Sequence, residues 1–344
     1  MSAVTKHERP GVYSSYEASS LTAAAAGGGN VAVVAKLNKT NLEPCYQWTS
    51  FSRAAADVGD CLLSRMAQLA IRNGAGVVYG IPAGEDYDDA FAVMAALEDV
   101  GVVVCDSTTL SVQQALKTAV EECSAARRER IAVVGGAAEE TVAQLIQRAS
   151  GLNSERMVLV APGAGDGSGG ALCAAAAAGA IAGSADPALP LGGAQLYGLE
   201  GLEASYDDGD IDLLVQGGVT PLETLAGACY VVRGVTTRTK TGGAVDATWR
   251  ELTTVLVVDE VIPGIRNALR AKFSRAKNTV QSRGAIRSLV VMELEKRVSR
   301  EIIDSYEDVT VSALESDPTV CLVEFAFTVA HGLNQVWLSA HITV

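Results

Sequence analysis

The chain has 344 residues, 49% of them hydrophobic, and a formal net charge of −13 at pH 7. This length and apolar share are sufficient for two domains with a substantial core. The acidic balance argues against a nucleic-acid partner, because it would repel a phosphate backbone. The longest apolar helical stretch, residues 171–183, is alanine-rich and too short to cross a bilayer, and the N-terminus lacks a signal-peptide core. We therefore expect a globular protein without a membrane or nucleic-acid partner.

The first 29 residues are expected to form an N-terminal arm. They are polar, and they contain a short alternating piece, GVYSSYEAS, followed by the flexible run AAAAGGG at residues 23–29.

Residues 30–205 predict an α/β domain. Apolar runs of strand length alternate with segments of helical spacing, and the five runs lie at residues 31–37, 75–81, 100–106, 130–136 and 156–162. The segments between them, which we expect to be helical, lie at residues 53–74, 88–100, 111–130 and 139–151. Strands that are apolar along their whole length are typical of a mostly parallel sheet covered by helices on both faces.

Residues 206–330 predict a smaller α+β domain. Helical segments are expected at about 257–280 and 284–303, and two strands at 320–329 and 335–344 resemble a hairpin with one buried side. The second strand belongs to the segment 331–344, an expected C-terminal arm in which Val336, Leu338, Ala340, Ile342 and Val344 alternate with polar residues. A strand at the end of a chain either joins its own sheet or offers an unpaired edge to another molecule.

The cysteines favour neither a disulfide framework nor a zinc site. They are odd in number and scattered, without Cys-x-x-Cys spacing, at positions Cys45, Cys61, Cys105, Cys123, Cys173, Cys229 and Cys321. We expect them to be reduced.

A glycine motif is the strongest enzymatic signal. Gly165, Gly167 and Gly170 have the Gly-x-Gly-x-x-Gly spacing of a dinucleotide fingerprint, between a predicted strand and a predicted helix. The motif follows the fifth strand rather than the first, and Asp186, the acid at the expected distance, lies in a predicted turn. A plain glycine-rich turn is the simpler interpretation. A nucleotide-binding α/β enzyme using the Gly165–Gly170 loop is the alternative function.

Other candidate sites have simpler structural explanations. Ser168 would need a histidine base, but the three histidines, His7, His331 and His341, all lie in the terminal segments. Several acidic groups offer oxygen ligands for a hard cation, although solvated acidic loops explain them better: Asp88 with Asp89, Glu139 with Glu140, and Asp207 with Asp208 and Asp210. We expect no catalytic residue, no metal site and no cofactor.

A basic strip follows Pro263 on a predicted helix. Its apolar face carries Ile265, Leu269 and Phe273, and its five basic residues are Arg266, Arg270, Lys272, Arg275 and Lys277. Such charges near a helix C-terminus complement its dipole, as Asp259 and Glu260 would near its start. Alternatively, they form a docking strip for an acidic partner.

Three parts of the sequence resemble a known family. The run VVRGVTTRTKTGGAVDATWRELTTVLVVDEVIPGIRNALRAKFSRAKN, the opening RPGVYSSYEAS and the terminal GLNQVWLSAHITV are similar to the tail sheath proteins of contractile phage tails and tail-like bacteriocins. The similarity is most specific across residues 219–344 and 9–18, and the α/β part agrees mainly in type. The resemblance implies a structural subunit without enzymatic activity, which polymerises helically around an inner tube and contracts to drive that tube through a cell envelope.

The resemblance also implies partners and contact residues. Each subunit would extend its arms into the sheets of neighbouring copies, through Val12, Tyr13, Tyr16 and the alternating residues Val336, Leu338, Ala340, Ile342 and Val344. The helix at 262–278 would bind the inner tail tube protein through the five basic residues. We place the hinges of the arms at the flexible run 23–29 and at the turn 330–334. Further implied features are six-fold rings, baseplate and tail terminator partners, a place in a virion tail or bacteriocin particle, and assembly in the cytoplasm of the host bacterium.

Overall fold

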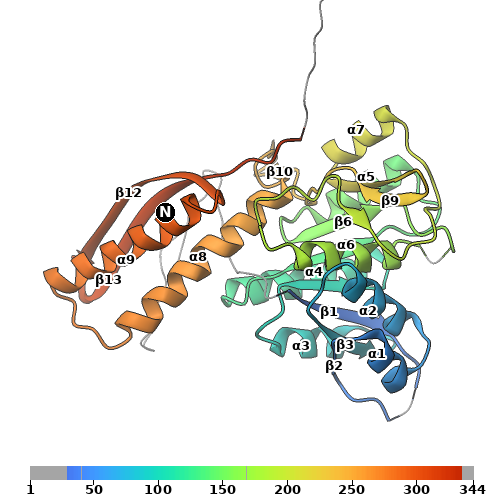
Figure 1. The fold of residues 1–344 in the computed structure, drawn as a ribbon, viewed down its shortest axis with the longest axis horizontal. Coiled ribbons are helices and arrows are strands. Elements are labelled where there is room, and N and C mark those ends of the chain that lie inside the picture. Colours follow the sequence, from blue (N-terminus) through green and yellow to red (C-terminus); the bar gives the residue numbers. More distant parts are fainter. Residues whose placement is uncertain (1–28, 40, 168, 335–344) are drawn as a thin grey trace, which may run out of the picture.

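The computed structural model describes residues 29–39, 41–167 and 169–334. Figure 1 shows an α/β domain, residues 29–251, and a C-terminal domain, residues 252–330, that extends to one side of it. None of the helices in these described ranges is both long and apolar enough to span a membrane.

The α/β domain is built on a nine-stranded sheet in the order β2-β3-β1-β4-β5-β6-β8-β9-β7. Strands β3, β1, β4, β5, β6 and β8 are parallel, whereas β2, β9 and β7 join antiparallel at the two ends. The bounds are β1 Asn30–Lys36, β2 Tyr46–Trp48, β3 Val77–Ala83, β4 Val102–Cys105, β5 Ile131–Gly135, β6 Met157–Ala161, β7 Gln195–Leu196, β8 Val219–Leu225 and β9 Ala228–Val231. The five predicted strands and the predicted fold class are confirmed.

Helices cover both faces of this sheet, as the fully apolar strands require. Their bounds are α1 Phe51–Val58, α2 Leu62–Arg72, α3 Asp88–Ala96, α4 Leu110–Ala125, α5 Val142–Leu152, α6 Ala171–Gly183 and α7 Asp208–Gln216. The helix predicted at 53–74 is divided into α1 and α2 at Gly59, whose φ of 77° ends the first of them.

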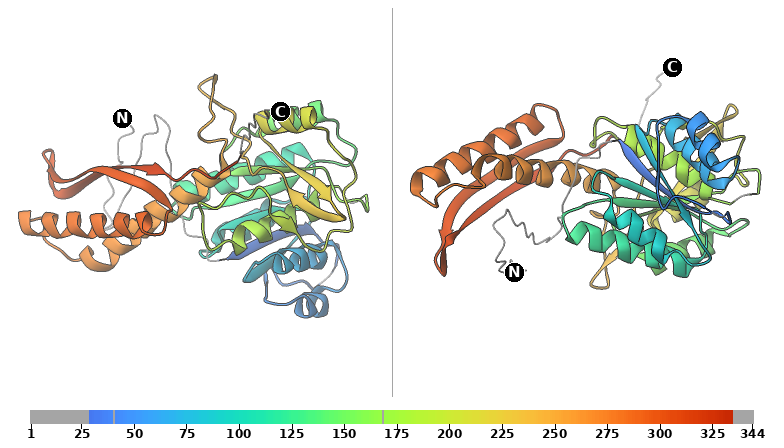
Figure 2. Two further views of the ribbon diagram at one scale, coloured as in Figure 1. Left: turned by 45° about the horizontal axis from the view of Figure 1, so that its top comes forward. Right: turned by 90° about the horizontal axis from the view of Figure 1, so that it is seen from below.

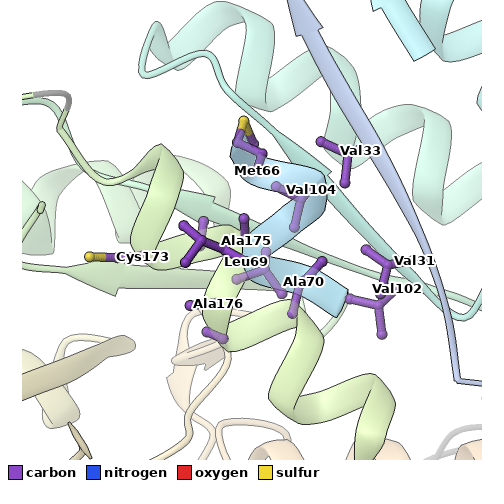
Figure 3. Close-up of a cluster of buried hydrophobic side chains, with 14 of the residues drawn as sticks. Val31, Val33, Met66, Leu69, Ala70, Val102, Val104, Cys173, Ala175 and Ala176 are labelled. Atoms are coloured by element: carbon purple, nitrogen blue, oxygen red, sulfur yellow. The ribbon is translucent and has the colours of Figure 1, made fainter. Parts of the chain in front are cut away.

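The alanine-rich helix α6 is almost entirely buried, which explains its composition. Its Ala175 and Ala176 belong to the same buried cluster as Met66, Leu69 and Ala70 of α2 and Val102 of β4 (Figure 3). Small side chains let two helices approach closely, so the long apolar stretch at 171–183 serves the core of the α/β domain.

The predicted domain boundary at residue 206 cuts through the sheet. Strand β8 pairs in parallel with β6, and β9 pairs with β8, so both belong to the α/β domain. A short projecting hairpin follows, formed by β10 Lys240–Thr241 and β11 Ala244–Val245. The change of architecture comes at Leu252, where α8 begins.

The C-terminal domain packs two helices on one face of a two-stranded antiparallel sheet. Its elements are α8 Leu252–Phe273, α9 Val280–Val298, β12 Ile303–Leu314 and β13 Asp317–Val329. Its core contains Val261 and Ile265 of α8, Val290 and Leu294 of α9, and Ile303 of β12.

Strand β12 was missed by the sequence analysis. The partner of β13 in the structure is β12, whereas the expected partner, residues 335–344, lies outside the described residues. Strand β12 is hard to recognise because register shifts interrupt its alternation, one of them around Asp308, whose φ is 52°.

Candidate functional site

The glycine loop between β6 and α6 uses its own amides inside the protein. The N–H of Gly165 donates to Gly201 O at 3.0 Å, that of Gly167 to Ala164 O at 3.2 Å and that of Gly170 to Gly136 O at 3.1 Å. A dinucleotide fingerprint needs backbone amides that point at a pyrophosphate. The three glycine amides of the motif already have acceptors within the protein.

Close packing explains Gly135, at the end of β5, and Gly170, just before α6. A Cβ on Gly135 would lie 2.2 Å from the carbonyl carbon of Gly170, so the end of β5 and the start of α6 approach within backbone contact. The loop also carries acidic groups, since Asp166 pairs with Arg65 at 2.9 Å and Glu203 accepts from Gly163 N at 3.0 Å. The charge of Glu203 beside the loop opposes phosphate binding, whereas that of Asp166 is balanced by Arg65.

The other sequence candidates have local structural roles or lie outside the described residues. Asp207 caps α7 by accepting from Asp210 N at 2.8 Å, and Glu140 pairs with Arg148 at 2.6 Å. Asp88 and Asp89 lie in the first turn of α3, where negative charge complements the helix dipole. Ser168, His7 and His341 are not described. Across the described ranges, no group of three or more His, Cys, Asp or Glu side chains is arranged to hold a metal ion.

Two buried ion pairs join α8 to the α/β domain. Arg156, just before β6, donates to both carboxylate oxygens of Asp259 at 2.9 and 2.7 Å. Arg266 donates to Glu129, just before β5, at 2.6 Å. Asp259 and Arg266 are seven residues apart and therefore lie on the same face of α8. The cost of taking such charges out of water offsets much of their attraction, so a buried pair adds little net stability.

These pairs change the expected roles of two residues. Arg266 is only 8% exposed, so it cannot belong to an exposed docking strip as expected. Asp259 does not lie at the helix start, because α8 begins seven residues earlier at Leu252. Burial raises the pKa of Asp259 to about 7, although the attraction of Arg156 acts in the opposite direction. The sequence carried no signal for Glu129 or Arg156 as their partners.

A third buried arginine connects α8 with α9 beside Pro263. Proline lacks the N–H that would donate to the carbonyl four residues earlier, and its ring crowds the preceding turn of the helix. Arg297 of α9 donates to Glu260 O at 3.2 Å and lies 3.5 Å from the Glu260 carboxylate. A Cβ on Gly264 would lie 1.8 Å from the Arg297 guanidinium, so glycine is needed there for space.

The remaining four basic residues form an exposed group. Arg270, Lys272, Arg275 and Lys277, called the basic group below, lie at the end of α8 and in the turn that follows. Figures 1 and 2 show that this end of α8 points away from the α/β domain. Within the part of the chain that the structure describes, none of the four forms an ion pair. Val280, the first residue of α9, lies next to the group in sequence and is 79% exposed.

The turn between α8 and α9 is connected to the sheet. Asn278 donates through Nδ2 to Pro318 O at 2.8 Å and to Val320 O at 3.1 Å. Its Oδ1 accepts from Arg283 at 2.9 Å. The basic group is therefore held next to the turn of the β12–β13 hairpin.

The two-stranded sheet offers backbone edges. Its strands are 12 and 13 residues long, and among the described residues neither outer edge has a partner strand. Its inner face packs on the helices, as the burial of Ile303, Val309 and Val329 shows. A long unpaired edge is a template for a strand from another chain. The expected exchanging residues of both arms lie outside the described residues.

The comparisons with known proteins agree with one another. Residues 81–237 match the phage tail sheath protein central domain, and residues 244–343 match the phage tail sheath C-terminal domain. The tail sheath protein of Bacillus phage SP01 is 27% identical over 253 residues, which cover 71% of this chain and 43% of that relative. The chain thus spans less than half the length of this relative.

Solved structures share the fold. The sheath tail protein from Desulfitobacterium hafniense has a TM-score of 0.66 at 12% identity, covering 93% of this chain and 100% of that one. The sheath of an extracellular contractile injection system in its contracted state has a TM-score of 0.71 at 15% identity, covering 99% of each chain. The two matched domains together account for most of the sequence, and the chain belongs to the phage tail sheath protein family.

Proposed function

We propose that this chain is the subunit of a contractile tail sheath, which polymerises helically around an inner tube and contracts to drive the tube through a cell envelope. The observation that carries the proposal is the two-stranded sheet β12–β13, whose outer edges have no partner among the described residues. The unpaired N–H and C=O groups along such a long edge can pair with a strand from another chain. Membership of the tail sheath family supports the same conclusion.

The added strands would come from neighbouring copies. We assign this role to the N-terminal arm, with Val12, Tyr13 and Tyr16, and to the alternating residues of 336–344. In β-augmentation, main-chain hydrogen bonds supply affinity and alternating side chains fix the register. An arm exchanged head to tail makes a contact that does not close on itself, so it produces a filament rather than a dimer.

Two charged substitutions on one face of the C-terminal strand test this proposal. Leu338→Asp with Ile342→Asp should abolish tube formation, because these apolar side chains would lie on the buried face of the extended sheet. Ser339→Asp with Thr343→Asp adds the same charge on the other face and should assemble better. Deletion of residues 335–344 should leave a folded subunit that does not assemble. Normal tubes from the deletion variant, seen by negative-stain electron microscopy, would refute strand exchange by this arm.

The basic group is the proposed contact with the inner tail tube protein, on which complementary acidic residues are expected. Arg270, Lys272, Arg275 and Lys277 are exposed and lie at the end of the C-terminal domain farthest from the α/β domain. Exposed pairs of opposite charge contribute little each and weaken with salt, which suits a contact that must be released. Arg266 does not belong to this proposal, because its side chain is buried against Glu129.

A charge reversal with a matched control tests the tube contact. Arg270→Glu with Lys277→Glu should weaken co-assembly with the tube and leave sheath self-assembly intact. Arg53→Glu with Lys240→Glu changes the net charge equally, but on the α/β domain, and should leave tube binding unaltered. Equal effects of the two variants would show that total charge, and not this group, governs the contact.

Contraction follows from two packings of the same subunits. The extended lattice would be held on the tube by the weak polar contacts, and the contracted lattice would gain contact between subunit bodies while exchanged strands stay paired. We propose six-fold rings, baseplate and tail terminator partners, assembly in the host bacterial cytoplasm, and a final place in a virion tail or bacteriocin particle. No enzymatic step and no cofactor are part of this function.

The first experiment is electron microscopy of the purified chain together with light scattering. Hollow tubes or short rings would support the sheath function. A uniform small oligomer, even with tube protein added, would refute it.

A further inference from the structure

The chain passes between the two domains twice, and both passages meet in one place. It leaves the α/β domain through Glu251 into α8, and it returns after β13 ends at Val329. Ala330 N donates to Ile302 O at 3.4 Å, and residues 331–334 then run back to the α/β domain, as the dark red segment in Figure 1 shows. The last described residues therefore lie against the α/β domain, where Asn334 lines the same cavity as Pro190 and Arg233.

The returning segment touches the α/β domain through a glycine. A Cβ on Gly332 would lie 2.1 Å from Cγ of Pro190, 3.0 Å from its Cδ and 3.2 Å from its Cβ. Real Cβ atoms do not approach other carbon atoms to 2.1 Å, so the backbone of Gly332 lies directly on the proline ring. Any other residue at position 332 would push the segment away.

Pro190 lies in a loop that is itself held in place. Gly193 N donates to Val231 O at 2.7 Å, and Ala194 N donates to Leu191 O at 3.1 Å. Leu191 packs against the core of the α/β domain. The ring is therefore a fixed surface, so an added side chain at position 332 must be accommodated by movement of the returning segment.

A cavity beside the contact provides room for that movement. It measures about 290 Å³, and its lining includes Pro190, Arg233, Glu251, Thr253, His331 and Gly332. Arg233 and Glu251 form an ion pair in its wall. Because this space adjoins the segment, displacement from Pro190 requires no disruption of either hydrophobic core.

We propose that Gly332 is a positioning residue for assembly: its contact with Pro190 sets the point and direction from which the C-terminal arm leaves the subunit. This inference rests on the proposed sheath function. Residues 330–334 were expected to be a hinge, but a segment packed at its centre is better suited to fix the direction of the arm than to let it turn freely.

The test is a compensating pair of substitutions. Gly332→Ala should give a folded subunit that forms few or no tubes. Proteolytic cleavage by chymotrypsin after Leu333, which is 78% exposed, should be about tenfold faster. Both effects are expected because overpacking displaces the segment from its contact. Pro190→Ala removes the two ring carbons nearest to the added methyl group. The double variant should therefore recover the tube yield and cleavage rate of Pro190→Ala alone. A merely destabilising substitution would not be rescued in this way.

Gly284→Ala is the matched control, because a Cβ at position 284 has open space around it. It should change neither readout. Normal tubes and an unchanged cleavage rate from Gly332→Ala would overturn the proposal, and so would failure of the double variant to recover. If the unmodified chain forms no tubes at all, the sheath function fails, while the cleavage rates of the subunit still decide whether the contact with Pro190 holds the segment.

Discussion

Removing the carboxylate of Asp259 should destabilise the protein strongly. The side chains of Arg156 and Asp259 are 4% and 6% exposed, and both carboxylate oxygens accept from the guanidinium. Asp259→Ala takes this carboxylate away from a buried positive charge that cannot regain its hydration. We expect a loss of about 3–5 kcal/mol in the free energy of unfolding, the range measured when one partner of a buried pair is removed.

An exposed pair provides the scale for this effect. Lys36 and Glu85 lie 3.1 Å apart, with side chains 41% and 84% exposed. Glu85→Ala should change the free energy of unfolding by about 1 kcal/mol or less, because water and salt screen the pair. Replacing both members of the buried pair by apolar residues of similar size, Arg156→Met with Asp259→Leu, should recover most of the loss.

Urea unfolding at pH 8, followed by tryptophan fluorescence, measures all three variants. The buried Trp249, three residues before α8, lies close to the junction in sequence. If Asp259→Ala costs no more than Glu85→Ala, the buried pair does not hold α8 on the α/β domain. If the apolar double variant is as unstable as Asp259→Ala, the loss comes from packing and not from an uncompensated charge.

Three further predictions concern titration, packing and the turn beside the basic group. Burial raises the pKa of Asp259 to about 7 from an unfolded value of ~3.9, so the folded state binds more protons between these two pH values. The free energy of unfolding should therefore fall as the pH rises through that window. Asp259→Asn should remove this part of the difference between the urea midpoints at pH 5 and pH 8. Gly135→Ala should cost about 1–3 kcal/mol or more by thermal unfolding, since its methyl group would meet the backbone of Gly170, and an equal effect from Gly151→Ala, where the nearest atom lies 3.6 Å away, would contradict this reason. Asn278→Ala should cost about 1 kcal/mol and speed hydrogen exchange at the tip of β13, and unchanged exchange there would show that the side chain does not hold the turn.

The parallel sheet was predictable because its pattern is local. Residues such as Val33, Val104, Val133 and Val160 lie in strands buried on both faces, and that burial demands uninterrupted apolar runs. The alanine-rich α6 has the same origin. Segments with this strong a pattern reveal both their type and their place in the order of the chain.

The C-terminal domain was harder to predict from a local pattern. Strand β12 lies at the edge of a two-stranded sheet, with exposed acidic residues and register shifts, so its alternation is interrupted. The boundary near residue 206 was misplaced because β8 and β9 differ in composition from the strands they join. Pairing with β6, which no local pattern reveals, places them in the same sheet.

The sequence by itself determined the α/β class, the two-part organisation and the family resemblance, because periodicity and characteristic runs depend only on residue order. The tertiary structure decided which polar groups are occupied. The glycine amides of the fingerprint donate to Gly136 and Gly201, and Arg266 pairs with Glu129, 137 residues away. A motif shows which groups are present, but whether they are available to a ligand depends on neighbours that only folding brings within hydrogen-bond distance.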